Sequence, residues 1–403
     1  MVHINDFLRK LEELKGSDIH FKVGAKPMIR IDGQLSNLED SEPLSEDDIQ
    51  KLFTQVTTVP EQESFREELE LDFSYADDEL GRFRFSAYQQ RGSICMACRQ
   101  VQTRIPTMEE LGLPEVCKKL ALQESGLILI CGPSGSGKST TLAAIIGYMN
   151  QNTRRNIITI EDPIEYVHND ILCSFSQRQV GSDTKSFNIA LRQALRQDPD
   201  VILMGEIRDL DSIATTLTAA ETGHLVLTTL HASNAIQALD RITDVFPAHQ
   251  QEQVRLQLAT TMRGILFQQL IPRIDQPGRV AAIEVLLASE AISNLIRTRK
   301  NYQIMNVIQS SSETGMQSLD SFVCNLYKQG IISREHAILH CRDSANLIDQ
   351  IEPPRSSRNR GGNRMLGGLR PRAHGDDAPE KLEGSYFRSS SLQEQLSGEA
   401  PEL

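Results

Sequence analysis

Residues 132–140 read Gly132-Pro-Ser-Gly-Ser-Gly-Lys-Ser-Thr140, after an apolar run at residues 127–131 and before a helical pattern at residues 141–149. Glycines let backbone N–H groups close around phosphate oxygens, the lysine reaches the β- and γ-phosphates, and the next hydroxyl can ligate Mg²⁺. Because the motif lies between the elements it requires, it predicts a nucleotide phosphate site. The predicted nucleotide-binding residues are Gly132, Pro133, Ser134, Gly135, Ser136, Gly137, Lys138, Ser139 and Thr140.

Outside this loop, short apolar runs alternate with helical patterns. Predicted strands cover residues 127–131, 156–160, 201–204 and 225–229, and predicted helices cover residues 141–149, 187–196 and 212–221. Strands that alternate with helices after a phosphate loop are typical of a parallel sheet covered by helices. The sequence therefore predicts an α/β core built around the loop.

Beyond Pro247 the apolar spacing predicts mostly helices. One amphipathic helical face is expected to carry Val254, Leu258, Met262, Ile265 and Leu266. Further helices are expected at residues 291–297, 316–329 and 334–340. A tail rich in Arg, Gly and Ser follows Ile351 and has too little apolar surface to fold. We interpret this tail as solvated, with a docking or phospholipid-binding role as the alternative.

The first hundred residues predict a separate small α+β domain. Ile4, Phe7, Leu8 and Leu11 recur at helical spacing, and a strand is expected at residues 19–23. Residues 69–75 alternate between apolar and polar side chains, and an acidic turn leads into a second strand at residues 82–88. Phe83 and Phe85 are expected to point inward, which leaves Arg82 and Arg84 together on the outer face. A third strand is expected at residues 93–99.

Bulk composition excludes several classes of protein. The formal charge of −12 implies no general affinity for nucleic acid. No apolar run approaches the roughly 20 residues that a membrane-spanning helix needs, and the first residues do not resemble a signal peptide. We therefore expect a cytoplasmic protein. Cys95 and Cys98 form the one CxxC pair among seven cysteines, so we expect reduced, packed thiols rather than a zinc site.

Three polar clusters follow predicted strands. Residues 161–165 read Glu-Asp-Pro-Ile-Glu, and carboxylates beside a nucleotide can orient water and metal. Gly205 and Glu206 follow the buried strand at residues 201–204, where a carboxylate can hold Mg²⁺ through water. His224 and His231 flank the strand at residues 225–229, and we interpret them as sensors of the γ-phosphate.

In this order, the four motifs resemble the Walker A loop, aspartate box, Walker B segment and histidine box of the type II/IV secretion ATPase superfamily, and the run at residues 191–209 is highly specific to it. Residues 16–21, 28–33, 283–285 and 315–320 resemble in particular the type IV pilus retraction ATPases, the PilT family. The longer N-terminal extension and tetracysteine insert usual in extension and secretion relatives are missing. One departure is Ser293, which replaces a charged residue in Ala291-Ile-Ser-Asn-Leu-Ile-Arg297 and bears on retraction efficiency rather than on ATP hydrolysis.

The resemblance implies a fold and a division into domains. A small α+β PAS-like N-terminal domain at residues 1–101 and a linker at 102–117 would precede a RecA-like P-loop ATPase domain at 118–352 with a helical C-terminal portion. A disordered tail at 353–403 would follow. The family also implies a homohexamer that hydrolyses ATP with Mg²⁺ and drives pilus retraction in twitching motility. Its partner would be an inner-membrane platform protein, met at the inner face of the cytoplasmic membrane.

The resemblance also implies roles for individual residues. Lys138 and Ser139 would contact phosphates and metal, Glu165 would be the general base, and Glu206 would order Mg²⁺ through its water shell. His231, and with it His224, would sense the γ-phosphate. Arg82 and Arg84 would act as arginine fingers, or they form a solvated strand face; the sequence favours neither interpretation.

Three other functions stay open at this point. A pilus-extension or type II secretion assembly ATPase would use the same chemistry with the opposite mechanical result. A nucleic-acid translocase would need a basic channel, which the acidic composition does not favour. A non-catalytic nucleotide binder would not need Lys138, Glu165 and Glu206 together.

Overall fold

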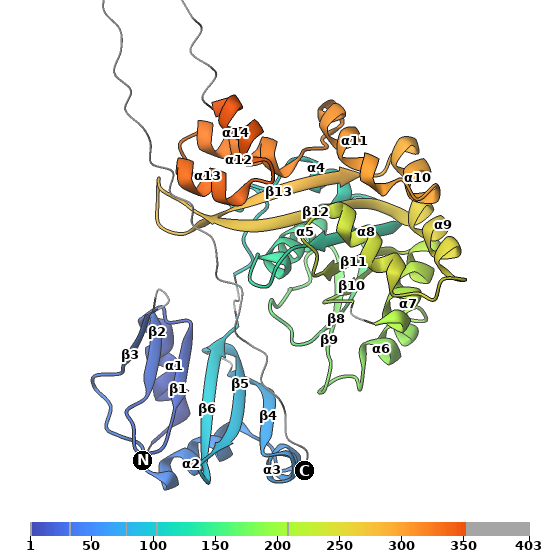
Figure 1. Ribbon diagram of the computed structural model, residues 1–403. Helices are drawn as coiled ribbons and strands as arrows, with labels where there is room; N and C mark the ends of the chain where they lie inside the picture. The colour runs from blue at the N-terminus through green and yellow to red at the C-terminus, as the bar shows by residue number, and fades with distance from the viewer. Residues whose placement is uncertain (1, 32–33, 78, 102–103, 208, 352–403) are drawn as a thin grey trace, which may run out of the picture. The chain divides into compact units, whose positions relative to one another are not determined.

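The computed structural model describes residues 2–31, 34–77, 79–101, 104–207 and 209–351. Gly33, Asp78, the start of the linker expected at residues 102–117 and the tail expected at residues 353–403 lie outside these ranges. The described strands form two sheets, and each sheet has its own covering helices (Figure 1). The chain thus has an N-terminal sheet domain and a larger domain in which helices cover a sheet.

The N-terminal sheet is antiparallel throughout and has the strand order β3-β2-β1-β6-β5-β4. Its elements are α1 (Ile4–Glu13), β1 (Asp18–Phe21), β2 (Met28–Ile31), β3 (Gln34–Asn37), α2 (Glu46–Val56), α3 (Val59–Glu68), β4 (Glu70–Asp77), β5 (Gly81–Gln90) and β6 (Ser93–Gln100). Phe73 and Phe85 lie opposite each other on β4 and β5, and their rings stack with centroids 5.3 Å apart. The predicted hairpin and its inward phenylalanines are confirmed.

The larger sheet has the order β13-β12-β7-β11-β10-β8-β9, and all its neighbours are parallel except β12 and β13. Its strands are β7 (Gly126–Cys131), β8 (Asn156–Glu161), β9 (Ser174–Gln179), β10 (Val201–Met204), β11 (Leu225–Leu230), β12 (Met262–Pro272) and β13 (Arg279–Leu287). Successive residues of β7 join different hydrophobic clusters, Leu129 on one face and Ile130 on the other. Helices therefore bury both faces of this sheet, which explains the continuous apolar runs of its strands.

Eleven α-helices belong to this larger domain within the described ranges. They are α4 (Val116–Ala121), α5 (Lys138–Asn152), α6 (Phe187–Ala194), α7 (Leu210–Glu221), α8 (Ala235–Asp244), α9 (Gln251–Thr261), α10 (Glu290–Arg297), α11 (Ile304–Ser310), α12 (Leu319–Lys328), α13 (Arg334–His340) and α14 (Ser344–Ile351). α12 and α13 pack with β13 and β12, and α14 packs on α12 and α13 (Figure 1). Among the described helices, none has the length and apolar character needed to cross a bilayer.

The expected helical face from Val254 to Leu266 is wrong in its second half. α9 ends at Thr261, and Met262 begins β12, a strand that pairs with β7 and β13. Residues 264–268 are all buried, so the strand shows no alternation of apolar and polar residues. A short apolar run of this kind cannot be told from a buried helix by spacing alone.

Two further expectations concern single residue types. All seven cysteines are free thiols and six of them are buried, as the sequence predicted. Ser293 lies on α10, where its hydroxyl donates to the backbone oxygen of Ala259 on α9 at 2.7 Å. The serine thus ties two helices together in place of presenting a charge.

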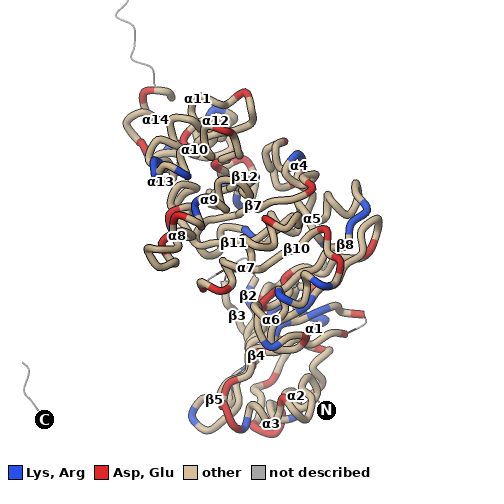
Figure 2. Tube along the Cα trace, turned by 90° about the vertical axis from the view of Figure 1, so that its right-hand side faces the viewer, with Lys and Arg blue, Asp and Glu red and all other residues tan. Residues whose placement is uncertain are grey.

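Charged residues of both signs are distributed over both domains. Figure 2 shows Lys and Arg segments interspersed with Asp and Glu segments along the chain trace. The composition, with 54 acidic and 42 basic residues, is acidic overall. It gives no support to the basic channel that a nucleic-acid translocase would need.

Candidate active site

The phosphate loop lies between the end of β7 at Cys131 and the start of α5 at Lys138. Gly132 has a φ of +154°, and a Cβ atom there would lie 2.2 Å from the backbone oxygen of Gln268. Gly137 caps α5 with a φ of +84°, in the left-handed region that side chains disfavour. The loop therefore depends on glycine at both ends, and it presents the N-terminus of α5, which favours anions.

Lys138 is half-buried and folds back over the loop. Its ammonium donates to the backbone oxygens of Gly132 at 3.1 Å and Pro133 at 2.9 Å. Burial lowers the pKa of Lys138, while the nearby Glu206 carboxylate acts in the opposite direction. A partly desolvated cation held over backbone amides is suited to a ligand with concentrated negative charge.

A cavity of about 640 Å³ opens beside this loop. The cavity brings together predicted site residues from five separate stretches of the chain. They are Arg84, Ser134, Gly135, Gly137, Lys138, Ser139, Thr140, Glu165, Glu206 and His231. A lining of this kind suits a nucleotide and a water molecule that attacks its phosphate.

The acidic cluster after β8 contains two different kinds of carboxylate. Glu161 accepts hydrogen bonds from Thr159 at 2.6 Å and Gln177 at 3.2 Å, and burial raises its pKa. Glu165 is exposed and lines the cavity. Both carboxylates line the cavity, but Glu161 is engaged by two hydrogen bonds, whereas Glu165 is exposed to a water molecule there.

Glu206 and His231 come from the ends of neighbouring parallel strands. Oε1 of Glu206 lies 3.3 Å from Nε2 of His231. Thr229 donates to the backbone oxygen of Gly205 at 2.6 Å, and Arg241 of α8 donates to the backbone oxygen of His231 at 2.7 Å. Both loops are thus fixed by hydrogen bonds from adjacent elements.

The other predicted site residues have different surroundings. Arg82 donates to Oε1 of Gln179, at the end of β9, at 3.1 Å, and Arg84 pairs with Asp72 at 3.2 Å. His224 precedes β11, whereas His231 follows it, and six residues of strand span about 20 Å. His224 hydrogen-bonds with the backbone oxygen of Ala219 and does not line the cavity. The structure therefore does not bring His224 together with the cavity residues.

The sequence interpretation missed Gln268 on β12. Its side-chain nitrogen donates to the backbone oxygen of Ser136 at 2.7 Å, and its oxygen accepts from Thr141 at 2.7 Å. The side chain is 2% exposed, so these bonds fix the inner side of the phosphate loop. The signal was an amide in a buried apolar run, which the helical interpretation of this segment hid.

One wall of the cavity was also missed. Tyr166 shares a hydrogen bond of 2.9 Å with Thr140, which ties the acidic loop to α5. His168 stacks on Phe175 with ring centroids 4.9 Å apart, and burial lowers the pKa of His168 to about 4. This histidine is neutral at physiological pH and forms a flat, uncharged wall.

Mg²⁺ fits the oxygen donors present. The Ser139 hydroxyl and the carboxylates of Glu165 and Glu206 line one cavity with Lys138, and Mg²⁺ prefers hard oxygen ligands shared with phosphates. The described residues offer no group of three or more His, Cys, Asp or Glu side chains that could hold a metal ion alone.

The fold and the cavity define a P-loop ATPase, and comparison with known proteins gives the family. The profile described as "Type II/IV secretion system protein" matches residues 83–339. The chain is 44% identical over 339 residues to the type IV pilus ATPase PilU of Pseudomonas aeruginosa, covering 84% of this chain and 88% of that protein. It is 44% identical over 321 residues to the type IV pilus retraction ATPase PilT of the same organism, covering 80% and 93%.

A solved structure agrees in fold. The crystal structure of the pilus retraction motor PilT with bound ADP superposes with a TM-score of 0.81 at 45% identity, covering 85% of this chain and 98% of that one. The chain therefore belongs to the type II/IV secretion ATPases, and within them to the PilT- and PilU-like pilus ATPases.

Proposed function

We propose that this chain is the subunit of a hexameric motor that hydrolyses ATP to retract type IV pili. The observation that carries the proposal is the cavity that gathers Lys138, Ser139, Glu165, Glu206 and His231 at one edge of the parallel sheet. Similarity to PilT and PilU over most of the chain supports a pilus motor, and the name of the former supports retraction.

Each cavity residue has a role that its surroundings support. Lys138 and the amides of the loop bind the β- and γ-phosphates, and Glu165, which is accessible from the cavity, accepts the proton of the attacking water. Glu206 and the Ser139 hydroxyl hold Mg²⁺, which neutralises charge on the phosphates when bound. His231 lies 3.3 Å from Glu206 and responds to the presence of the γ-phosphate.

Arg82 and Arg84 complete the site in our proposal. Both lie on β5, and Arg84 reaches the lining of the cavity. Guanidinium groups offset the charge that builds on the transferring phosphoryl group. Their present partners, Gln179 and Asp72, are neutral or exposed, so a phosphate can displace them at small cost.

The mechanical output follows from the two-domain design. Closure around ATP and opening after hydrolysis rotate one domain against the other, and rigid-body rotation of this kind changes the shape of a ring. We propose that the ring turns an inner-membrane platform protein at the pilus base, so that the motor works in the cytoplasm at the inner face of the membrane. We further propose the domain limits given above, 1–101, 102–117, 118–352 and 353–403.

Two experiments test the proposal. Purified full-length chain is expected to release phosphate from ATP only with Mg²⁺, and Lys138→Ala is expected to abolish that activity. Deletion of the gene is expected to leave excess surface pili and to stop twitching. Loss of pili in the deletion strain would instead identify an extension motor, and unchanged pili with a loss of protein secretion would identify a type II secretion assembly motor.

A further inference from the structure

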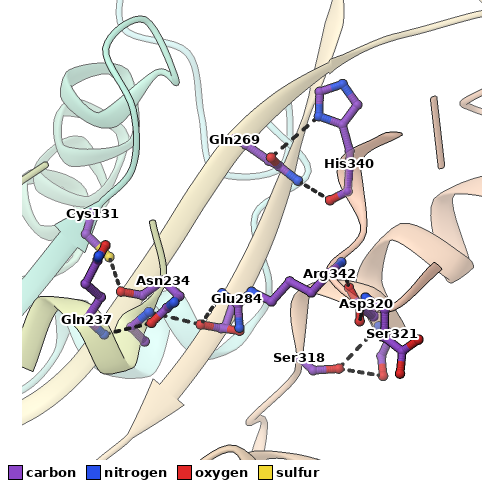
Figure 3. Close-up of polar contacts among 12 residues, drawn as sticks. Cys131, Asn234, Gln237, Gln269, Glu284, Ser318, Asp320, Ser321, His340 and Arg342 are labelled. Carbon is purple, nitrogen blue, oxygen red and sulfur yellow. Dashed lines mark hydrogen bonds and ion pairs between the residues drawn. The ribbon is translucent and has the colours of Figure 1, made fainter. Parts of the chain in front are cut away.

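An ion pair joins the buried Glu284 of β13 to Arg342, which follows α13 (Figure 3). Glu284 is 0% exposed, and its Oε2 lies 2.6 Å from Nη1 of Arg342, while Nη2 of Arg342 donates to Oε1 at 3.0 Å. Burying a carboxylate is expensive, and apolar residues of similar volume often stabilise a core as well or better. Stability alone therefore gives little reason for this pair.

The carboxylate also holds the beginning of α8. The backbone N–H of Ala235, the first residue of the helix, donates to Oε1 of Glu284 at 3.0 Å. A negative charge is favourable at this end of a helix because unpaired N–H groups and the helix dipole point at it. The preceding residue, Asn234, caps the helix, and its backbone oxygen accepts a weak bond from the thiol of Cys131 at 3.9 Å. Cys131 is the last residue before the phosphate loop.

α8 in turn fixes His231. Arg241 donates to the backbone oxygen of His231 at 2.7 Å, and Gln237 accepts from both the backbone and the hydroxyl of Ser233. The segment before α8 is thus attached to the helix at His231, Ser233 and Asn234. Because Arg241 holds the His231 backbone, we expect a shift of α8 to move the imidazole relative to Glu206.

The C-terminal helices hold Arg342 on the other side of the Glu284 carboxylate from α8. Its backbone N–H donates to Asp320 of α12 at 2.7 Å, and that of Asp343 donates to the same carboxylate at 3.1 Å. The guanidinium lies 5.6 Å from the ring centroid of Phe267 on β12. These contacts fix the turn between α13 and α14 and hold the guanidinium against the Glu284 carboxylate (Figure 3).

We propose that Glu284 and Arg342 are positioning residues that hold α8, and through it His231, in register with the nucleotide, so that the placement of helices α12–α14 sets the rate of hydrolysis. The inference rests on the proposed ATPase function and deepens it. The paired contacts between the Arg342 guanidinium and the Glu284 carboxylate connect the turn between α13 and α14 to the first turn of α8. The Glu284 side chain makes the contacts on both sides.

The first test is kinetic. Glu284→Gln keeps the shape and the acceptor for Ala235 but removes the charge, and Arg342→Gln leaves the carboxylate without its cation. Both are expected to lower kcat on the order of 10- to 100-fold, since a misplacement of about 1 Å can cost that much in a catalytic site. Affinity for MgADP, measured with a fluorescent analogue, is expected to stay within about twofold because the phosphate loop is untouched. Arg342→Lys keeps the charge without the paired contacts and is expected to recover part of kcat.

The matched control lies on the same hairpin. Arg273 pairs with Asp275 at 2.6 Å in the connection between β12 and β13, outside the contacts with α8 described above, and Arg273→Gln is expected to leave kcat unchanged. Thermal melting of every variant separates a loss of folded protein from a loss of rate. If Arg342→Gln does not fold, the isosteric Glu284→Gln decides the question.

The second test asks whether the pair acts through the histidine. In a His231→Gln background, Glu284→Gln is expected to lower kcat much less than in the wild-type chain, because contacts in one pathway are not additive. Full additivity, or a wild-type kcat in folded Glu284→Gln protein, overturns the inference while leaving the ATPase proposal intact. Absence of phosphate release from the wild-type chain overturns both.

Discussion

The two sheets of this protein use charged residues in different ways. In the parallel sheet, polar residues follow the strands, and the loops after β7, β8, β10 and β11 meet at one edge around the cavity. In the antiparallel sheet, charged residues lie on strand faces and pair with neighbouring strands, as Asp18 does with Arg99 at 2.7 Å. Parallel strands gather distant parts of the sequence at one edge, whereas an antiparallel face joins only adjacent strands. The first arrangement gathers most of the cavity lining, and the second mainly stabilises a strand face, from which Arg84 reaches that lining.

The carboxylate that follows β8 offers the strongest test of this contrast. Glu165→Gln removes the proposed base without changing size, and kcat is expected to fall by about 10²–10⁴-fold, the usual range for a general base. Affinity for MgADP should be retained, because Glu165 acts on water. Steady-state phosphate release and ADP titration measure the two quantities. Glu124→Gln, an exposed residue before β7, is the control, and a normal kcat in Glu165→Gln would transfer the role to another carboxylate.

The next largest effect is expected at the inner side of the phosphate loop. Gln268→Leu leaves the Ser136 oxygen and the Thr141 hydroxyl without their partner, and unmade buried hydrogen bonds cost about 1–3 kcal/mol each. We expect ADP to bind at least about tenfold more weakly. The neighbouring Gln269 points to the other side of the strand, where it donates to the backbone oxygen of His340 at 2.7 Å. Gln269→Leu should leave ADP affinity unchanged, and equal losses in both variants would contradict a specific anchor.

These two residues also show what the sequence could and could not predict. Glu165 belongs to a local motif at the end of a strand, and its place beside the phosphate loop follows from the parallel topology. Gln268 meets Ser136 across 132 residues of sequence, and no local pattern records that contact. Two elements were predicted with their observed bounds, the strand at residues 201–204 and the helix at residues 334–340. In each case turn or capping residues mark where the apolar pattern begins and ends.

The remaining misses have a common cause. β12 and β13 are buried on both faces, so their apolar residues show neither helical spacing nor alternation. Glu284 was visible in the sequence only as part of a family resemblance, because its meaning depends on Arg342 and on the start of α8. Long-range pairing, rather than local propensity, decides both features.

A substitution at Asp18, in the antiparallel sheet, should change the free energy of unfolding rather than the rate of ATP hydrolysis. Asp18 is 8% exposed; burial acts to raise its pKa, but hydrogen bonds from Ser17 and Arg99 outweigh that and hold the pKa below its usual value. Arg99 is largely exposed, so solvent limits the gain, and Asp18→Asn is expected to cost about 1–2 kcal/mol of unfolding free energy at pH 7.

The pH dependence of that loss has a definite sign. Because the folded pKa is depressed, the contribution of Asp18 is present above the unfolded pKa of 3.8 and disappears as pH falls through the folded value. Urea unfolding at pH 7 and in acid should therefore show wild type and Asp18→Asn converging at low pH. Asp47→Asn, which breaks an exposed pair with Lys51, should leave the free energy of unfolding unchanged at both pH values. A constant difference at all pH values would contradict the ionic explanation.

The smallest effect is expected at His224, which precedes β11. Here the two ends of a single strand can be compared directly. His224 and His231 flank the same six-residue strand, but only His231 lies at the edge that carries the phosphate loop. His224→Gln keeps a group able to hydrogen-bond with the backbone of Ala219 and should leave kcat and MgADP affinity unchanged. His231→Gln removes the group beside Glu206 and should lower kcat by about 10–100-fold. Because the two substitutions are chemically identical, any difference in phosphate release comes from position alone, and a comparable loss at His224 would show that the amino end of the strand also contacts a nucleotide.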